Sequence, residues 1–88
     1  MVIEENWGIS IERVRCFFRE QKDVVSDGER EDGEGYRYKE CRIFLTATEE
    51  KMMNKWKFPR TIIRFEGKEQ EVQEIYQRFF LRFLSAGG

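Results

Sequence analysis

Residues 68–85 read KEQEVQEIYQRFFLRFLS, and this stretch decides the fold. Its apolar side chains recur three and four positions apart, a spacing that places them along one face of an α-helix. They are Val72, Ile75, Tyr76, Phe79, Phe80, Phe83 and Leu84. Acidic residues near the start, and Arg78 and Arg82 near the end, match the helix dipole. Because burying each Phe contributes roughly 1.5–3 kcal/mol, we predict a C-terminal helix that dominates the core.

Two stretches before this helix have the alternation of β-strands. Residues 36–47, YRYKECRIFLTA, place apolar side chains on both faces. One face would hold Cys41, Ile43, Leu45 and Ala47, and the other Tyr36, Tyr38, Arg42 and Phe44. In residues 60–67, RTIIRFEG, the residues Ile63 and Phe65 oppose Arg60, Ile62 and Arg64. Two strands make a marginal sheet, so residues 2–3 or 24–25 are candidates for a third strand.

The segment before these strands predicts a further helix, over residues 10–22. Ser10 can cap it, and Ile11, Val14, Phe17 and Phe18 fall on one arc with Val25. The competing interpretation is a strand, because RVRCFF is rich in β-forming residues. If it is a helix, we expect it to cover Phe44 and Ile62 on the sheet face that the C-terminal helix leaves free.

The two remaining segments predict connections. Residues 26–35, SDGEREDGEG, combine glycines with Asp27, Glu29, Glu31, Asp32 and Glu34, so we expect a flexible acidic loop. Thr48 can cap a short helix or turn before Pro59. The predicted fold class is therefore α+β: a single domain over residues 1–88, with a short, mainly antiparallel sheet packed in two layers against the C-terminal helix and a probable N-terminal helix.

Composition bounds the class of protein. The chain has 88 residues, a formal net charge of -1 and two cysteines without CxxC spacing, so it has no disulfide framework. The start, MVIEENWGIS, lacks the regions of a signal peptide. No apolar run approaches the ~18 residues of a membrane span. These features predict a soluble cytoplasmic protein with reduced thiols and no membrane partner.

No side-chain arrangement indicates an enzyme. The chain contains no histidine, which excludes Ser-His-Asp and Cys-His arrangements within it. Two cysteines cannot complete a four-ligand zinc site, and the glycines do not match GxGxxG or the P-loop. We therefore predict no catalytic residues, no metal, no cofactor and no small-molecule substrate, with Cys41 in the core.

The basic and aromatic segment 36–65 is the candidate binding surface. Aromatic side chains on a sheet can stack on bases while Lys and Arg hold phosphates. The candidate residues are Tyr36, Arg37, Tyr38, Lys39, Arg42, Lys55, Trp56, Lys57, Arg60 and Arg64. The aromatic content also favours a protein interface. We predict a non-catalytic protein-interaction or regulatory accessory domain that binds a protein partner or forms a homodimer. The alternative is a small nucleic-acid-binding accessory protein.

The last four residues, SAGG, resemble the Gly-Gly tail of ubiquitin-like sulfur carriers. In those carriers the tail follows a strand of a β-grasp domain. Here the preceding pattern is helical, and glycine is also a common helix terminator. We therefore favour the interpretation that these glycines end the C-terminal helix.

Overall fold

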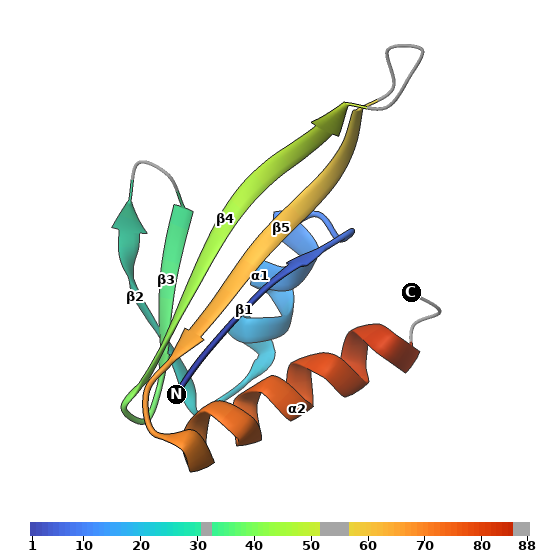
Figure 1. Cartoon of the computed structure of the whole chain (residues 1–88). Coiled ribbons are helices and arrows are strands. Elements are labelled where there is room, and N and C mark those ends of the chain that lie inside the picture. The colour runs from blue at the N-terminus through green and yellow to red at the C-terminus, as the bar shows by residue number, and fades with distance from the viewer. Residues whose placement is uncertain (31–32, 52–56, 86–88) are drawn as a thin grey trace.

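The fold is a single sheet with two helices against it (Figure 1). A computed structural model describes residues 1–30, 33–51 and 57–85, with side chains left out at 29–30, 49–51, 57–58 and 85. The elements in chain order are β1 (Val2–Trp7), α1 (Ile11–Glu20), β2 (Val24–Arg30), β3 (Gly33–Tyr38), β4 (Cys41–Lys51), β5 (Lys57–Glu66) and α2 (Glu69–Ser85).

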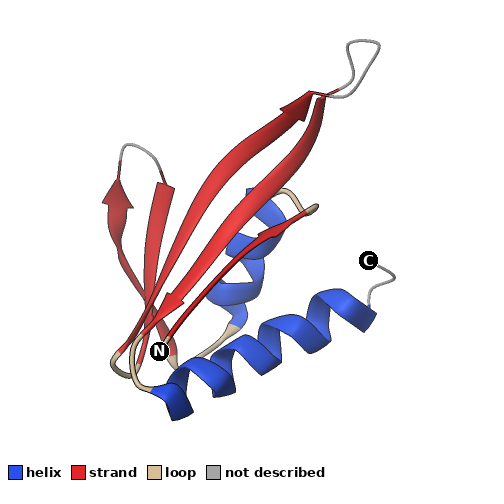
Figure 2. Ribbon diagram, viewed as in Figure 1, coloured by secondary structure: helices blue, strands red, loops and turns tan. Residues whose placement is uncertain are grey.

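The five strands pair in the order β1-β5-β4-β3-β2, and every neighbouring pair is antiparallel. Both stretches considered for a third strand join the sheet, as its two edges β1 and β2. The β4–β5 hairpin is the longest pairing and extends beyond the helices (Figure 2). This confirms a small antiparallel α+β domain with a C-terminal helix.

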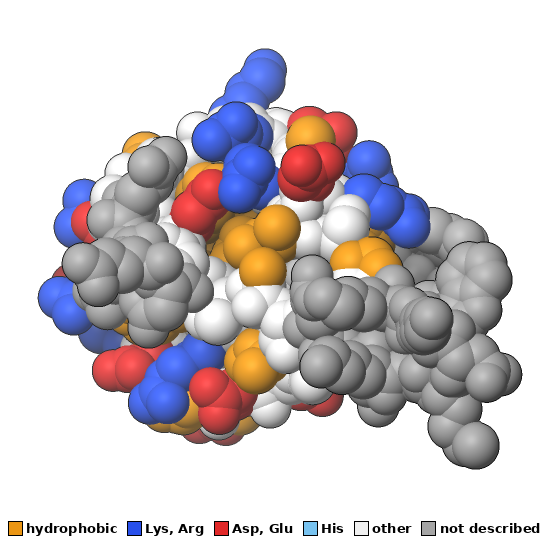
Figure 3. Space-filling model, turned by 90° about the horizontal axis from the view of Figure 1, so that it is seen from above, with side chains coloured by type: hydrophobic (Ala, Val, Ile, Leu, Met, Phe, Trp, Pro, Cys, Tyr) orange, Lys and Arg blue, Asp and Glu red, His pale blue; other side chains and the backbone are white. Residues whose placement is uncertain are grey.

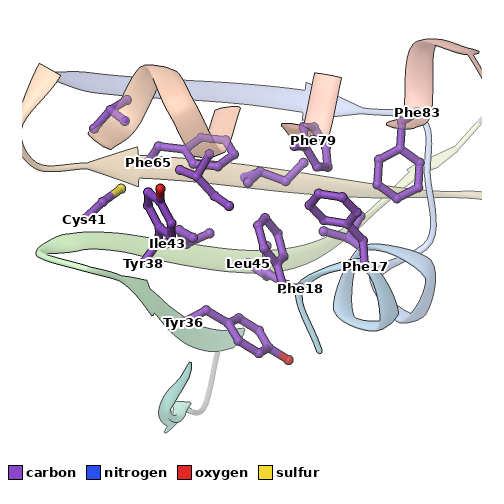
Figure 4. Packing of buried hydrophobic residues seen from close by; sticks show 14 of the residues in the cluster. Phe17, Phe18, Tyr36, Tyr38, Cys41, Ile43, Leu45, Phe65, Phe79 and Phe83 are labelled. Carbon is purple, nitrogen blue, oxygen red and sulfur yellow. The ribbon is translucent and has the colours of Figure 1, made fainter. Parts of the chain in front are cut away.

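Both helices pack on the same face of the sheet. The rings of Phe18 in α1 and Phe79 in α2 stack with centroids 6.1 Å apart, and Phe17 lies 6.0 Å from Phe79. Figure 4 shows these rings meeting over Ile43, Leu45 and Phe65 of the sheet. The prediction that the first helix covers Phe44 and Ile62 on the other face is therefore wrong. The two apolar stripes bury each other as well as the sheet, which removes more apolar surface from water than separate faces would.

The helix predicted over residues 10–22 is α1 at Ile11–Glu20, and the competing strand is wrong. It is not an additional N-terminal helix, because β1 precedes it. Ser10 takes the N-cap position, where its carbonyl accepts the first helical N–H bonds, but its side chain makes no cap hydrogen bond.

The predicted strand over residues 36–47 is two strands. Lys39 and Glu40 form a turn between β3 and β4, and Lys39 has a φ of 55°. A two-residue turn changes which parity of residue faces the core. Tyr36 and Tyr38 therefore point the same way as Cys41, Ile43 and Leu45, and all are buried. The alternation predicted for β5 is confirmed: Thr61, Ile63 and Phe65 are buried, and Ile62 and Arg64 face the other side.

Two predicted connections are largely strand. Most of the segment expected to be an acidic loop, residues 26–35, belongs to β2 and β3, which pair on both sides of a bulge between Ser26 and Glu29. Gly28 at this bulge has a φ of 95°, a conformation that glycine adopts without strain. Over residues 48–51 the helix or turn expected after Thr48 is replaced by β4, in which Thr48 pairs with Arg60 and Glu49 with Pro59; residues 52–56 of that segment lie outside the described part of the chain. In both segments, pairing with a neighbouring strand satisfies the backbone N–H and C=O groups, although the local composition predicts a loop or turn.

Cys41 is fully buried, as predicted, and Cys16 is exposed on α1. Of the helices that the structure describes, none is long and apolar enough to cross a membrane.

Candidate functional site

The tyrosines of the predicted binding surface lie inside the protein. Tyr36 and Tyr38 are 2% and 1% exposed. The Tyr36 hydroxyl donates to Glu34 at 2.8 Å, and the Tyr38 hydroxyl donates to Glu74 of α2 at 2.6 Å. Burial raises the pKa of Tyr36, and for Tyr38 the hydrogen bond to Glu74 and burial both raise the pKa. These rings join the helices to the sheet and are not available for stacking on a ligand.

The arginines of that surface lie together on the sheet face that the helices leave uncovered, here called the open face. Arg37 of β3 pairs directly opposite Arg42 of β4, and both are exposed. Arg60 donates from Nε to Asn6 Oδ1 at 2.9 Å. Arg64 donates from Nε to Glu66 Oε2 at 3.2 Å. The structure therefore brings the four arginines together on one face and places Tyr36 and Tyr38 on the other.

In the described part of the chain, none of the lysines of the predicted surface, nor its tryptophan, is placed beside these arginines. Lys39 lies in the β3–β4 turn, with its Nζ 3.5 Å from Glu74 Oε2. Lys55 and Trp56 fall outside the described residues, and Lys57 is described only as the first residue of β5.

The open face contains a hollow of about 300 Å³. Its lining includes Gly33, Phe44, Thr46, Arg64 and Glu66. Gly35 of β3 lies directly opposite Phe44 of β4, so this position of β3 adds no side chain beside the Phe44 ring. The hollow therefore combines an apolar floor with charged walls.

A second hollow, of about 350 Å³, lies where the start of α1 meets the end of α2. Its lining residues are Ser10, Glu12, Arg13, Cys16, Arg82 and Phe83. The guanidinium of Arg13 lies 5.8 Å from the Phe83 ring centroid, and Arg82 donates to Glu20 at 3.1 Å. This hollow is next to the last described turn of α2, which residues 86–88 follow in the sequence.

Several charged side chains accept hydrogen bonds that join one element to another. Although burial opposes ionisation of Glu34, hydrogen bonds from Arg15 and Tyr36 hold its pKa below the usual range. The hydrogen bond from Tyr38 does the same for the pKa of Glu74. Among residues 1–30, 33–51 and 57–85, no group of three or more Cys, Asp or Glu side chains could hold a metal ion. Figure 3 shows small hydrophobic patches separated by side chains of both charges on the face in view.

The remaining chemical feature is the Gly-Gly pair at positions 87 and 88. From the sequence alone we interpret it as a helix terminator; α2 is described as far as Ser85, and residues 86–88 lie outside the described part of the chain. The sequence signal for another role is the dipeptide itself, in the segment SAGG.

A search of curated proteins and a search of solved structures each returned no match. A family model described as "Archaeal MoaD-like protein" matches residues 3–88. This span includes all the described strands and helices, apart from Val2 at the start of β1, and the Gly-Gly pair. The match contradicts both predicted functions, the protein-interaction or regulatory accessory domain and the nucleic-acid-binding alternative. The chain belongs to the archaeal MoaD-like protein family.

Proposed function

We propose that this protein is a sulfur-carrier-like small protein in which the α-carboxylate of Gly88 is the group that becomes loaded with sulfur. The observation that carries the proposal is the family match, which extends over residues 3–88 and so includes Gly87 and Gly88. The resemblance of SAGG to the tail of ubiquitin-like sulfur carriers supports it.

The chemistry requires an activated acyl group. A carboxylate reacts poorly with nucleophiles, because an oxide anion is a poor leaving group. If a carboxylate oxygen of Gly88 attacks the α-phosphorus of ATP, pyrophosphate leaves and a mixed anhydride forms. Hydrosulfide then attacks the acyl carbon, AMP leaves, and Gly88 ends as a thiocarboxylate. Neither step changes an oxidation state.

The chain needs a separate enzyme for these steps. Its glycines match neither the P-loop nor GxGxxG, so the sequence offers no nucleotide-binding motif of those kinds. We therefore place this protein as the substrate of an adenylating enzyme rather than as the catalyst. That enzyme would approach the end of α2, where the second hollow lies.

The body of the domain would serve to present the tail. Val72, Ile75 and Phe79 of α2 are fully buried, and Phe83 is 5% exposed. These contacts fix the last turns of α2 on the sheet. In ubiquitin-like carriers the tail follows a strand, whereas here a 17-residue helix stands between β5 and the Gly-Gly pair. An adenylating enzyme would therefore recognise a helix end beside the tail.

The test is reconstitution with ATP, sulfide and an adenylating enzyme of the ubiquitin-activating class, followed by intact-mass spectrometry. The expected product has one oxygen exchanged for one sulfur, and deletion of Gly88 abolishes it. Ala86→Ser is the matched control and should load normally. Cys16→Ser identifies a competing product: if air oxidises some of the sulfide to polysulfide, the polysulfide could convert Cys16 to a persulfide, which adds a whole sulfur atom without loss of oxygen. Loading that survives deletion of Gly88 would refute the proposal.

A further inference from the structure

The open face carries two neighbouring arginines, Arg37 and Arg42, that make no ion pair within the described part of the chain. Arg37 and Arg42 are direct cross-strand partners in the β3–β4 register. Like charges directly opposite each other destabilise a sheet. Among the described residues neither has an ion-pair partner, although Arg64 on the same face has two, with Glu66 at 3.2 Å and Glu4 at 4.0 Å. Glu66 of β5 lies opposite Arg42 on its other side, but its carboxylate pairs with Arg64, so an external anion could still bridge Arg37 and Arg42.

The hollow of about 300 Å³ lies beside this pair. Phe44 follows Arg42 by two residues along β4 and therefore points to the same face. Its ring and Ile62 of β5 are half-buried although no helix covers them. Gly33 of β3 lines the hollow, and Gly35 lies opposite Phe44 in the register; neither adds a side chain to this part of the face. The hollow is large enough for one apolar side chain.

The described side chains of the open face carry a positive net charge. They include four arginines and two glutamates: Arg37, Arg42, Arg60 and Arg64 with Glu4 and Glu66. The whole chain, in contrast, has a formal charge of -1. An apolar centre with arginines at its rim is the usual composition of a protein interface, in which Arg is enriched. Guanidinium groups bind carboxylates in bidentate fashion.

We propose that the open face is the docking surface for an acidic protein segment that places one apolar side chain in the hollow and carboxylates on Arg37 and Arg42. This surface goes beyond the chemistry proposed for Gly88. Both helices pack on the opposite face of the sheet, so an occupant of the open face would leave the end of α2 uncovered.

The probe is a fluorescein-labelled peptide of repeating Glu-Leu, with a repeating Lys-Leu peptide of equal length as the comparison. The expected result is salt-sensitive binding of the Glu-Leu peptide alone, measured by fluorescence anisotropy. Arg42→Glu and Arg37→Glu should each weaken binding about tenfold, since each removes a charge-assisted hydrogen bond. Thr46→Trp should fill the hollow and weaken binding without changing the net charge.

The matched control is Arg19→Glu, which makes the same change in charge on α1, on the opposite face of the sheet. It should change binding less than about twofold, because water and salt screen exposed charges that lie on the far side of the sheet. Equal losses for Arg19→Glu and Arg42→Glu would overturn the proposal, as would no binding of the Glu-Leu peptide to the native chain. Circular dichroism of each variant shows that it is folded, and Arg42→Lys should retain part of the affinity. Since the peptide does not need Gly88, the chain lacking Gly88 should bind equally well, which separates this test from that of sulfur loading.

Discussion

The packing of both helices on one face makes a quantitative prediction about Phe18 and Phe79. Their rings are stacked at 6.1 Å with an interplanar angle of 1°, and both side chains are fully buried. Phe18→Leu and Phe79→Leu should each cost about 1–1.5 kcal/mol, because leucine is smaller than phenylalanine and leaves a small cavity in the core. The pair should not be additive, because an aromatic contact contributes about 0.5–1.5 kcal/mol beyond its buried area. The coupling energy in a double-mutant cycle should fall in that range.

The assay is urea unfolding followed by circular dichroism, with the m-value tested for constancy. A domain of this size has a stability of about 4–13 kcal/mol, so the double variant should remain folded. With a slope of about 1–3 kcal/mol/M, each single change should lower the midpoint by about 0.3–1.5 M. The control cycle pairs Phe18→Leu with Leu81→Ala, since Leu81 is 55% exposed, and should be additive within about 0.5 kcal/mol. Additivity of Phe18→Leu and Phe79→Leu would refute the shared-face packing.

Three further predictions follow from individual side chains. The Arg15–Glu34 ion pair, at 2.5 Å, joins α1 to β3 and, with the Tyr36 hydrogen bond, outweighs burial to hold the pKa of Glu34 below 4.5. The ion pair therefore stabilises the fold above pH 4.5, and this stabilisation is lost as the pH falls through the folded-state pKa of Glu34. In urea unfolding, the difference in stability between the native protein and Glu34→Gln should therefore disappear in acid. A difference that does not depend on pH would contradict this. Burial and the hydrogen bond to Glu5 raise the pKa of Tyr76 to about 12, which favours the protonated folded state. Stability should therefore decline as the pH rises from 10.0 towards 12. In urea titrations at alkaline pH, Tyr76→Phe should remove part of that decline. Cys16 is exposed, whereas Cys41 is buried and burial raises its pKa. A thiol reagent should therefore label only Cys16 in the native protein and both cysteines in urea. Rapid labelling of Cys41 in the native protein would show that the core opens.

The sequence determined the elements whose periodicity is strong and local. The stripe from Val72 to Phe83 specifies α2, because no other backbone conformation places those side chains on one face. The alternation of Ile62, Ile63, Arg64 and Phe65 likewise specifies both faces of β5. The Gly-Gly pair is also visible in the sequence. The helical pattern before it favoured a helix terminator, and the family match over residues 3–88 is what supports the proposed sulfur-carrier tail.

Tertiary structure decided what depends on pairing between distant residues. The turn at Lys39 and Glu40 reverses the parity of β3 relative to β4, so Tyr36 and Tyr38 are buried while Arg37 and Arg42 meet on the open face. The glycine-rich acidic segment becomes β2 and β3 because neighbouring strands supply its hydrogen bonds, although its own composition favours a turn. The face that α1 covers was decided by contacts of Phe17 and Phe18 with Phe79, more than 60 positions away in the chain. Local pattern specifies which side of an element is apolar, and only packing decides what that side meets.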